Sequence, residues 1–238
     1  GVVKIPDVRI DRLSSIYNPK KTTRATVEYI DYAGIASGSD AVQNLKVFNL
    51  IKDVDAIVHV VRAFEDESII HPWDNINPKR DVMSFEAELI LGDLEFVEKR
   101  LQKIEEQAKK GKKQVGDSTL RDEADRHLLM KCKKALEEEI SLRNLEFNEE
   151  EKRQMFAYQF LSTMPEIIAL NISEKDIDSE KVKNFQSEIE AYFKDLGQRS
   201  IPPVIALCGK IEMEIAQLPA DEAKAFLDDL GIDEPAMN

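Results

Sequence analysis

Five short segments rich in β-branched and aliphatic residues recur along the 238-residue chain, and they limit its possible folds more than any other feature. They are residues 1–5, 25–30, 55–61, 166–170 and 203–208. Several are apolar almost throughout, which is typical of parallel strands covered by helices on both faces. The residues after Glu180 repeat apolar side chains at spacings of three and four and stop at Gly197, which indicates a helix leading into the last strand. The sequence therefore predicts an α/β fold with a mostly parallel sheet.

About a hundred residues separate the strand predicted to end near residue 61 from the strand predicted to begin at residue 166. A parallel crossover needs only a dozen or so residues, so a further structure is expected in this interval. Two amphipathic stripes lie there on either side of residues 111–119, and they consist of Leu94, Val97, Leu101, Ile104 and Ala108, and of Leu129, Cys132 and Leu136. They predict an antiparallel coiled-coil arm.

A third helix is expected after Asn148, which is a good N-cap residue followed by three glutamates. Its residues Met155 and Phe156, with Phe160 beyond them, are expected to return the chain to the sheet. Near the end of the chain, residues 218–231 predict one more short helix.

Composition excludes several classes of partner and location. The formal net charge of -13 disfavours direct binding to duplex DNA, because neutralising phosphates requires clustered Lys and Arg. No apolar run reaches the roughly 20 residues that span a bilayer, and we expect a cytoplasmic protein without a membrane partner. The two cysteines, Cys132 and Cys208, have no metal-ligand spacing and are expected to be reduced and buried.

The residues 27–34, VEYIDYAG, place Asp31 and Gly34 directly after a predicted strand. In nucleotide switches such an Asp holds Mg²⁺ through water, and a Gly three residues later approaches the γ-phosphate. Asp and Gly also end strands as ordinary caps and turns, so this pattern alone leaves both interpretations open.

A second motif follows the predicted strand at residues 166–170. Asn171, Ile172 and Glu174 occupy the positions of the guanine-reading sequence NKxD, but an Ile replaces its Lys and a Glu replaces its Asp. The longer Glu side chain weakens the paired contact with guanine, which makes adenine plausible. The same stretch is also compatible with a plain strand end and helix cap.

A third element, Cys208-Gly209-Lys210, ends the last strand pattern and could offer backbone N–H groups to a base. It is not a phosphate loop, because no G-x-x-x-x-G-K-[ST] occurs anywhere in the sequence. Hydrolysis by these residues alone is therefore not expected.

Together, the order of these motifs and of the helical insertion resembles the YchF subfamily of Obg-related P-loop NTPases, called Obg-like ATPases in eukaryotes. Segments such as GVVKIPD, NISE and FLDDLGIDEP carry the resemblance from end to end. It implies a G domain formed by residues 1–80 and 161–238, interrupted by a coiled-coil arm at residues 81–160. It also implies Mg²⁺ with ATP or GTP, frequently with a preference for ATP, and association with ribosomes or translation.

Carried over by position, Asp31 and Gly34 match the family's Asp-x-x-Gly, and the motif starting at Asn171 matches its Asn-x-x-Glu. Ile35 occupies the position of the water-orienting Gln of Ras-like proteins, and an aliphatic side chain cannot polarise water. His71 matches a His proposed for that role in relatives, although it could simply pack beside its neighbours.

For the other two histidines we expect structural roles only. His59 is expected to be a satisfied core residue, and His127 is expected to face solvent on the arm.

The resemblance also implies that the family's phosphate loop precedes the equivalent of Gly1 and that its TGS domain follows the equivalent of Asn238. We expect the chain to be the central part of a longer protein rather than a degenerate relative, and to bind nucleotide weakly when isolated. The alternative function is a non-catalytic interaction module that docks a protein partner through its acidic arm.

Overall fold

The structure is a computed structural model that describes residues 1–32, 34, 47–71, 73–109, 117–198, 200–219, 222–223 and 227, with only the backbone of residues 117–122. The chain divides into two units, which are described separately. One unit comprises Gly1–Gly34 and Gly209–Asn238, and the other comprises Ile35–Cys208. The helix predicted at residues 218–231 lies largely outside the described residues, and the predicted domain limits at residues 80 and 160 stay predictions.

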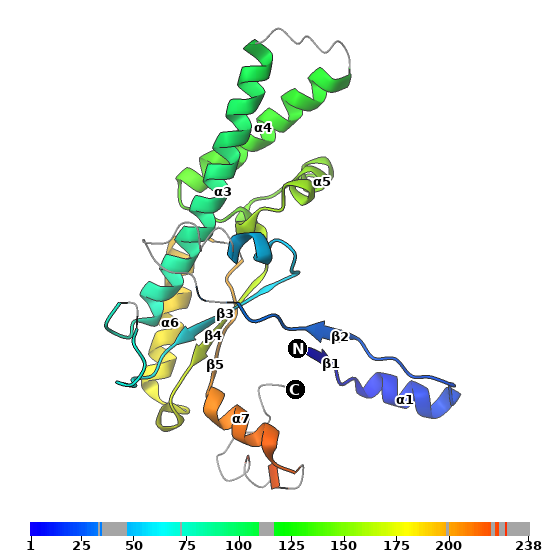
Figure 1. Cartoon of the computed structure of the whole chain (residues 1–238), viewed down its shortest axis with the longest axis vertical. Coiled ribbons are helices and arrows are strands. Elements are labelled where there is room, and N and C mark those ends of the chain that lie inside the picture. Colours follow the sequence, from blue (N-terminus) through cyan, green and yellow to red (C-terminus); the bar gives the residue numbers. More distant parts are fainter. Residues whose placement is uncertain are drawn as a thin grey trace. The chain divides into compact units, whose positions relative to one another are not determined.

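The first unit contains a two-stranded antiparallel ribbon (Figure 1). Strand β1 (Val2–Lys4) pairs with β2 (Thr26–Glu28), and all six residues are exposed. Both segments are strands, as predicted, but they pair with each other in opposite directions instead of extending the parallel sheet. The reason is the connection between them, in which helix α1 (Val8–Tyr17) ends at a left-handed Asn18 and the chain then turns back. This unit also contains α7 (Gly209–Gln217).

The second unit is built on a parallel sheet, as predicted. Its strands are β3 (Ile57–Arg62), β4 (Glu166–Asn171) and β5 (Val204–Leu207), in the order β3-β4-β5. Helix α6 (Glu180–Asp195) connects β4 to β5, begins at the N-cap Ser179, and is followed by Gly197 at a positive φ of 66°. The middle strand is the most deeply buried of the three, because it pairs with a neighbouring strand along each edge.

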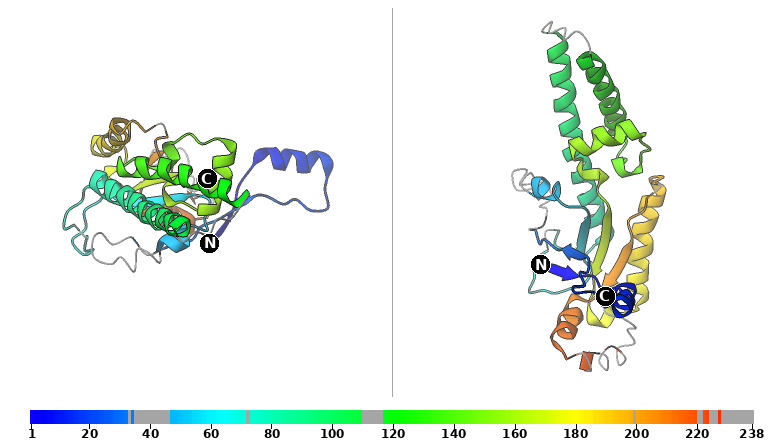
Figure 2. Two further views of the ribbon diagram at one scale, coloured as in Figure 1. Left: turned by 90° about the horizontal axis from the view of Figure 1, so that it is seen from above. Right: turned by 90° about the vertical axis from the view of Figure 1, so that its right-hand side faces the viewer.

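The predicted helical arm is present in this unit. Helices α3 (Pro78–Lys109) and α4 (Asp117–Glu137) pack side by side, as Figure 2 shows from two directions. Val97 and Leu101 of α3 meet Leu129, Cys132 and Leu136 of α4 in a common apolar core. Burial of this stripe, at roughly 25 cal/mol per Å² of apolar surface, is what holds the two helices together.

The chain leaves the arm through three short helices, η1 (Leu142–Asn144), α5 (Glu149–Tyr158) and η2 (Leu161–Thr163). Asn148 is the N-cap of α5, as predicted. It also forms a full capping box, because its side chain accepts the Glu151 N–H while the Glu151 carboxylate accepts the Asn148 N–H. Two expectations for the arm are wrong. Ala108 is exposed, and Phe156 is 87% exposed because α5 turns only Met155 fully inward.

A second apolar cluster lies below the arm, around Phe48, Ile51, Ile57, Leu89 and Leu161. Leu89 belongs to α3, so this one 32-residue helix contributes to the arm core and also to the core beside the sheet. A continuous helix that packs at both places fixes the root of the arm relative to the sheet. Within the described ranges, no helix is long and apolar enough to cross a membrane.

Candidate functional site

The carboxyl edge of the parallel sheet holds the central part of the predicted nucleotide site. Asn171 is the last residue of β4 and lies in register with Arg62 of β3 and Leu207 of β5. The Ile172 N–H donates to the Leu207 carbonyl at 2.9 Å, and the Ala63 N–H donates to the Asn171 carbonyl at 2.8 Å. Ligands of open parallel sheets bind at this edge. The structure therefore brings the Asn-x-x-Glu motif beside the end of β5, where Cys208 follows.

The residues of this motif are held by local hydrogen bonds. The Ser173 hydroxyl accepts the Lys175 N–H at 3.2 Å and so caps the short helix η3 (Glu174–Asp176), which begins at Glu174. The Ile172 side chain is only 5% exposed, so most of it packs in the interior at this edge of the sheet. Cys208 is also buried, as predicted for both cysteines. Gly209 and Lys210 are the first two residues of α7 and lie in the other unit.

Asp31 and Gly34 lie in the first unit, where Asp31 is exposed three residues after the end of β2. A Cβ atom added to Gly34 would meet nothing within 4 Å, so the chain leaves open space at this glycine. A lone exposed carboxylate fits Mg²⁺ held through water, because Mg²⁺ keeps several waters and takes few protein ligands. No group of three His, Cys, Asp or Glu side chains able to hold a metal occurs in the parts of the chain that the structure describes. Ile35 lies outside the described residues.

His71 lies in the connection from β3 to α3 and is anchored at both ring nitrogens. Its Nε2 is 3.2 Å from the Asp81 Oδ2, and its Nδ1 accepts the Trp73 N–H at 3.2 Å. The His71 side chain is 12% exposed, whereas the neighbouring Ile70 is 91% exposed. The imidazole is thus packed inward in this arrangement.

Sequence reasoning missed the residue that organises the start of this connection. Arg62, the last residue of β3, donates to three backbone carbonyls, those of Phe64, Asp66 and Ile69, at 2.9 to 3.0 Å. A guanidinium with several fixed donors can hold such a loop in one shape. The only signal in the sequence is an Arg at the end of an apolar strand.

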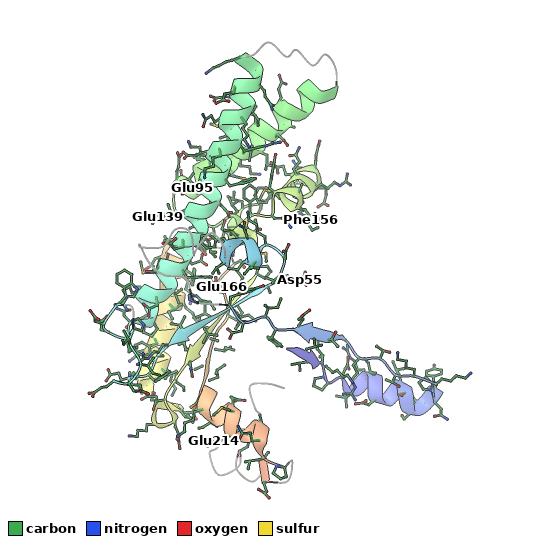
Figure 3. All side chains as sticks on the ribbon, viewed as in Figure 1. Asp55, Glu95, Glu139, Phe156, Glu166 and Glu214 are labelled. Carbon is green, nitrogen blue, oxygen red and sulfur yellow. The ribbon has the colours of Figure 1, made fainter. Side chains whose placement is uncertain are left out.

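A buried charged cluster joins α3, η1 and the sheet, and sequence reasoning missed this as well. Arg143 lies between the Glu86 and Glu166 carboxylates, and all three side chains are at most 6% exposed. The Ser141 hydroxyl donates to Glu86 at 2.7 Å. Figure 3 shows Glu166 where the arm meets the sheet.

The buried surroundings shift the pKa values of Glu86, which belongs to this cluster, and of His59, which lies beside it. Burial, followed by the neighbouring Glu166 carboxylate, raises the pKa of Glu86 to about 7. Burial lowers the pKa of His59 to about 4, so this imidazole is neutral at pH 7. The His59 ring lies 4.1 Å from the Phe85 ring, between centroids, which agrees with a core position. Its Nδ1 is 3.3 Å from Glu166 but makes no well-formed hydrogen bond with any residue that the structure describes, so the expectation of a satisfied histidine is wrong. His127 is exposed, as predicted.

Comparison with known proteins gives relatives over the whole chain, although no family model matches it. It is 36% identical to the "Ribosome-binding ATPase YchF" of Bacillus subtilis over 240 residues, which cover 100% of this chain and 63% of that protein. It is 32% identical to the protein of the same name from Escherichia coli O157:H7, covering 100% of this chain and 62% of that protein. The chain thus spans somewhat less than two thirds of the length of these curated relatives.

Among solved structures, the Schizosaccharomyces pombe YchF GTPase matches with a TM-score of 0.72 at 24% identity, covering 97% of this chain and 61% of that one. This match shows the fold and confirms the predicted α/β sheet with its helical insertion. Over its full length, this chain is a homologue of the YchF proteins, as the resemblance of its motifs indicated.

Proposed function

We propose that this chain is the nucleotide-binding core of a YchF-type NTPase that works with the ribosome. The observation that carries the proposal is the position of Asn171 and Glu174 at the carboxyl end of the middle strand of the sheet. The adjacent β5 ends in register with Asn171 and is followed by Cys208-Gly209-Lys210. The Asn-x-x-Glu motif and Cys208 thus follow neighbouring strands of a fold that binds ligands at this edge.

At this edge, Asn171 would contact the base with its side-chain amide, which both donates and accepts hydrogen bonds. The Glu174 carboxylate sits one methylene farther from the backbone than the Asp of a guanine-reading site, which favours ATP or mixed use of ATP and GTP. Ile172 contributes apolar packing beneath the base, and the backbone N–H groups of residues 208–210 are the candidates for contacts with its ring edge.

For the phosphates, we propose that Asp31 helps to hold Mg²⁺ through water and that Gly34 lets the backbone approach the γ-phosphate. Bound Mg²⁺ would neutralise phosphate charge and thereby ease phosphoryl transfer. The aliphatic Ile35 cannot orient the attacking water, so we assign this task to His71. The phosphate loop would be supplied by sequence outside these 238 residues.

The arm is the proposed contact with the ribosome or with a protein partner. Its inward stripe is used in packing α3 against α4, which leaves charged side chains such as Glu95, Glu105 and Lys134 to face outward or line the groove between the helices. Relatives that match the whole chain are named for ribosome binding. Work on the ribosome would place the protein in the cytoplasm.

Equilibrium binding of ATP and GTP to the complete natural protein tests the proposal. We expect Asn171→Ala to weaken ATP binding by at least tenfold, because a base contact of about 1.5 kcal/mol or more is lost. Asn184→Ala is the matched control, because Asn184 is exposed on α6. If both variants bind ATP as the wild type does, the proposed base site is wrong. Ribosome co-sedimentation without any nucleotide binding would support the interaction module instead.

A further inference from the structure

The connection between β3 and α3 is closed by a compact set of contacts around His71. The Asp74 N–H donates to the His71 carbonyl at 3.1 Å, and Asp74 has a positive φ of 57°, so the chain turns back sharply here. The Trp73 N–H then reaches the His71 Nδ1 at 3.2 Å. One imidazole nitrogen is therefore paired with the turn that follows it.

The other nitrogen is paired with the first turn of α3. The His71 Nε2 is 3.2 Å from the Asp81 Oδ2, and both side chains are largely shielded, with exposures of 12% and 16%. Because Nδ1 accepts the Trp73 N–H, Nε2 must carry the proton of the neutral ring, and this nitrogen faces the Asp81 carboxylate. The Trp73 N–H and the Asp81 carboxylate thus favour the same tautomer and the same orientation of the imidazole.

Asp81 is itself fixed. Arg80 donates to the Asp81 Oδ1 from Nε at 3.1 Å and from Nη2 at 2.9 Å. The same guanidinium lies over the Trp73 ring at 5.3 Å and donates to the Asn75 carbonyl at 2.9 Å. The Oδ2 that faces His71 is therefore held by a residue that also ties down the turn.

From this geometry we propose that Asp81 is the positioning residue of His71 in the proposed hydrolysis. By keeping the proton on Nε2, Asp81 makes Nδ1 the only ring atom able to accept a hydrogen bond from water. In the arrangement seen here the Trp73 N–H occupies Nδ1. For Nδ1 to meet a water molecule, the turn at residues 73–75 must therefore open.

The role of Asp81 in hydrolysis rests on the proposed function. Its effect on the tautomer of His71 does not, and it can be measured separately. Nuclear magnetic resonance of the imidazole nitrogens in the 238-residue chain, which has three histidines, reads the tautomer without any nucleotide. We expect His71 to show the Nε2–H tautomer, and we expect Asp81→Ala to raise the fraction of the Nδ1–H tautomer, because only the Trp73 N–H then opposes it. An unchanged tautomer in that variant overturns the proposal and leaves the proposed function untouched.

Hydrolysis by the complete natural protein supplies the second readout. Asp81→Ala should lower kcat by about tenfold to a hundredfold, the range typical of residues that orient an essential His, with little change in KM. Asp81→Glu keeps the carboxylate and should restore part of kcat, whereas a purely structural role would not distinguish the two variants in this way.

Asp74→Asn is the matched control, because it removes a carboxylate from the same turn and Asn tolerates a positive φ. If Asp81→Ala has no more effect on kcat than Asp74→Asn, Asp81 does not position His71. If the wild-type protein does not bind ATP, the proposed function is wrong. The tautomer measurement would still decide whether Asp81 orients His71.

Discussion

Arg143 pairs with Glu166 at 2.9 Å, and neither side chain is more than 6% exposed. Arg143 lies in η1, just beyond the arm, whereas Glu166 is the first residue of β4, the strand that carries Asn171 at its other end. The same Arg143 nitrogen also contacts Glu86 of α3 at 3.0 Å. A single guanidinium thus ties the root of the arm to the strand that presents the candidate base site.

Removing this guanidinium should destabilise the second unit strongly. Arg143→Met leaves two buried carboxylates without their cation, and breaking a buried pair in this way costs about 3 to 5 kcal/mol. Urea unfolding followed by circular dichroism measures the loss. Arg153→Met, at an exposed position on α5, is the control and should change the free energy of unfolding by less than about 0.5 kcal/mol.

The raised pKa of Glu86 predicts a loss of stability with rising pH. The folded-state pKa of about 7 lies above the ordinary value of 4.5, so protonated Glu86 favours the folded state at low pH. This contribution, up to about 3 kcal/mol, fades between pH 4.5 and 7, because the unfolded chain gives up this proton in that range while the folded protein still binds it. Glu86→Gln should therefore gain stability relative to the wild type across this window. A constant difference between the two proteins from pH 4.5 to 7 would contradict this assignment.

The lowered pKa of His59 predicts a loss of stability with falling pH, the opposite of the effect of Glu86. Its folded-state pKa of about 4 lies below the ordinary 6.5, so its neutral form favours folding above pH 6.5 and this contribution is lost as the pH falls toward 4. His59→Gln, which cannot become charged, should lose less stability than the wild type between pH 6.5 and 4.5. Chemical denaturation at these two pH values makes the comparison, and equal losses would show that His59 is not a buried neutral histidine.

Asp93 of α3 holds the start of η2 in place. Its carboxylate accepts the Leu161 N–H and the Ser162 N–H, both at 2.8 Å, and the Ser162 hydroxyl at 2.6 Å. Asp93→Ala leaves these buried donors unpaired and should cost about 2 to 4 kcal/mol in the free energy of unfolding. Glu95→Ala alters an exposed acidic residue of the same helix and should be nearly neutral. Equal effects of the two substitutions would contradict the buried role of Asp93.

The parts of the fold that sequence predicts best are those decided by apolar periodicity. The segments predicted at residues 55–61 and 166–170 correspond to β3 and β4, whose apolar side chains have helices or other strands to pack against, and the stripe through Val97 and Leu101 is buried for the same reason. Asn148 was recognisable because a capping box is a local pattern of four residues.

Elements without such a pattern escaped prediction. Helix α1 buries no residue, so no apolar stripe marks it, and its signals were only the N-cap Asp7 and the left-handed Asn18 before a proline. The charged cluster joins Glu86 and Arg143 across 57 residues of sequence, and a charge in a sequence does not name a distant partner. The pairing of His71 with Asp81 depends likewise on the turn between them.

Photo-crosslinking with an azido-adenine analogue of ATP tests the central claim most directly, because it marks the residues that lie beside the base. In the complete natural protein, we predict that the labelled peptides contain residues 171–174 or 208–210 and that excess ATP prevents the labelling. Labelling confined to the arm helices α3 and α4, or labelling that excess ATP does not reduce, would contradict a base site at the carboxyl edge of the sheet.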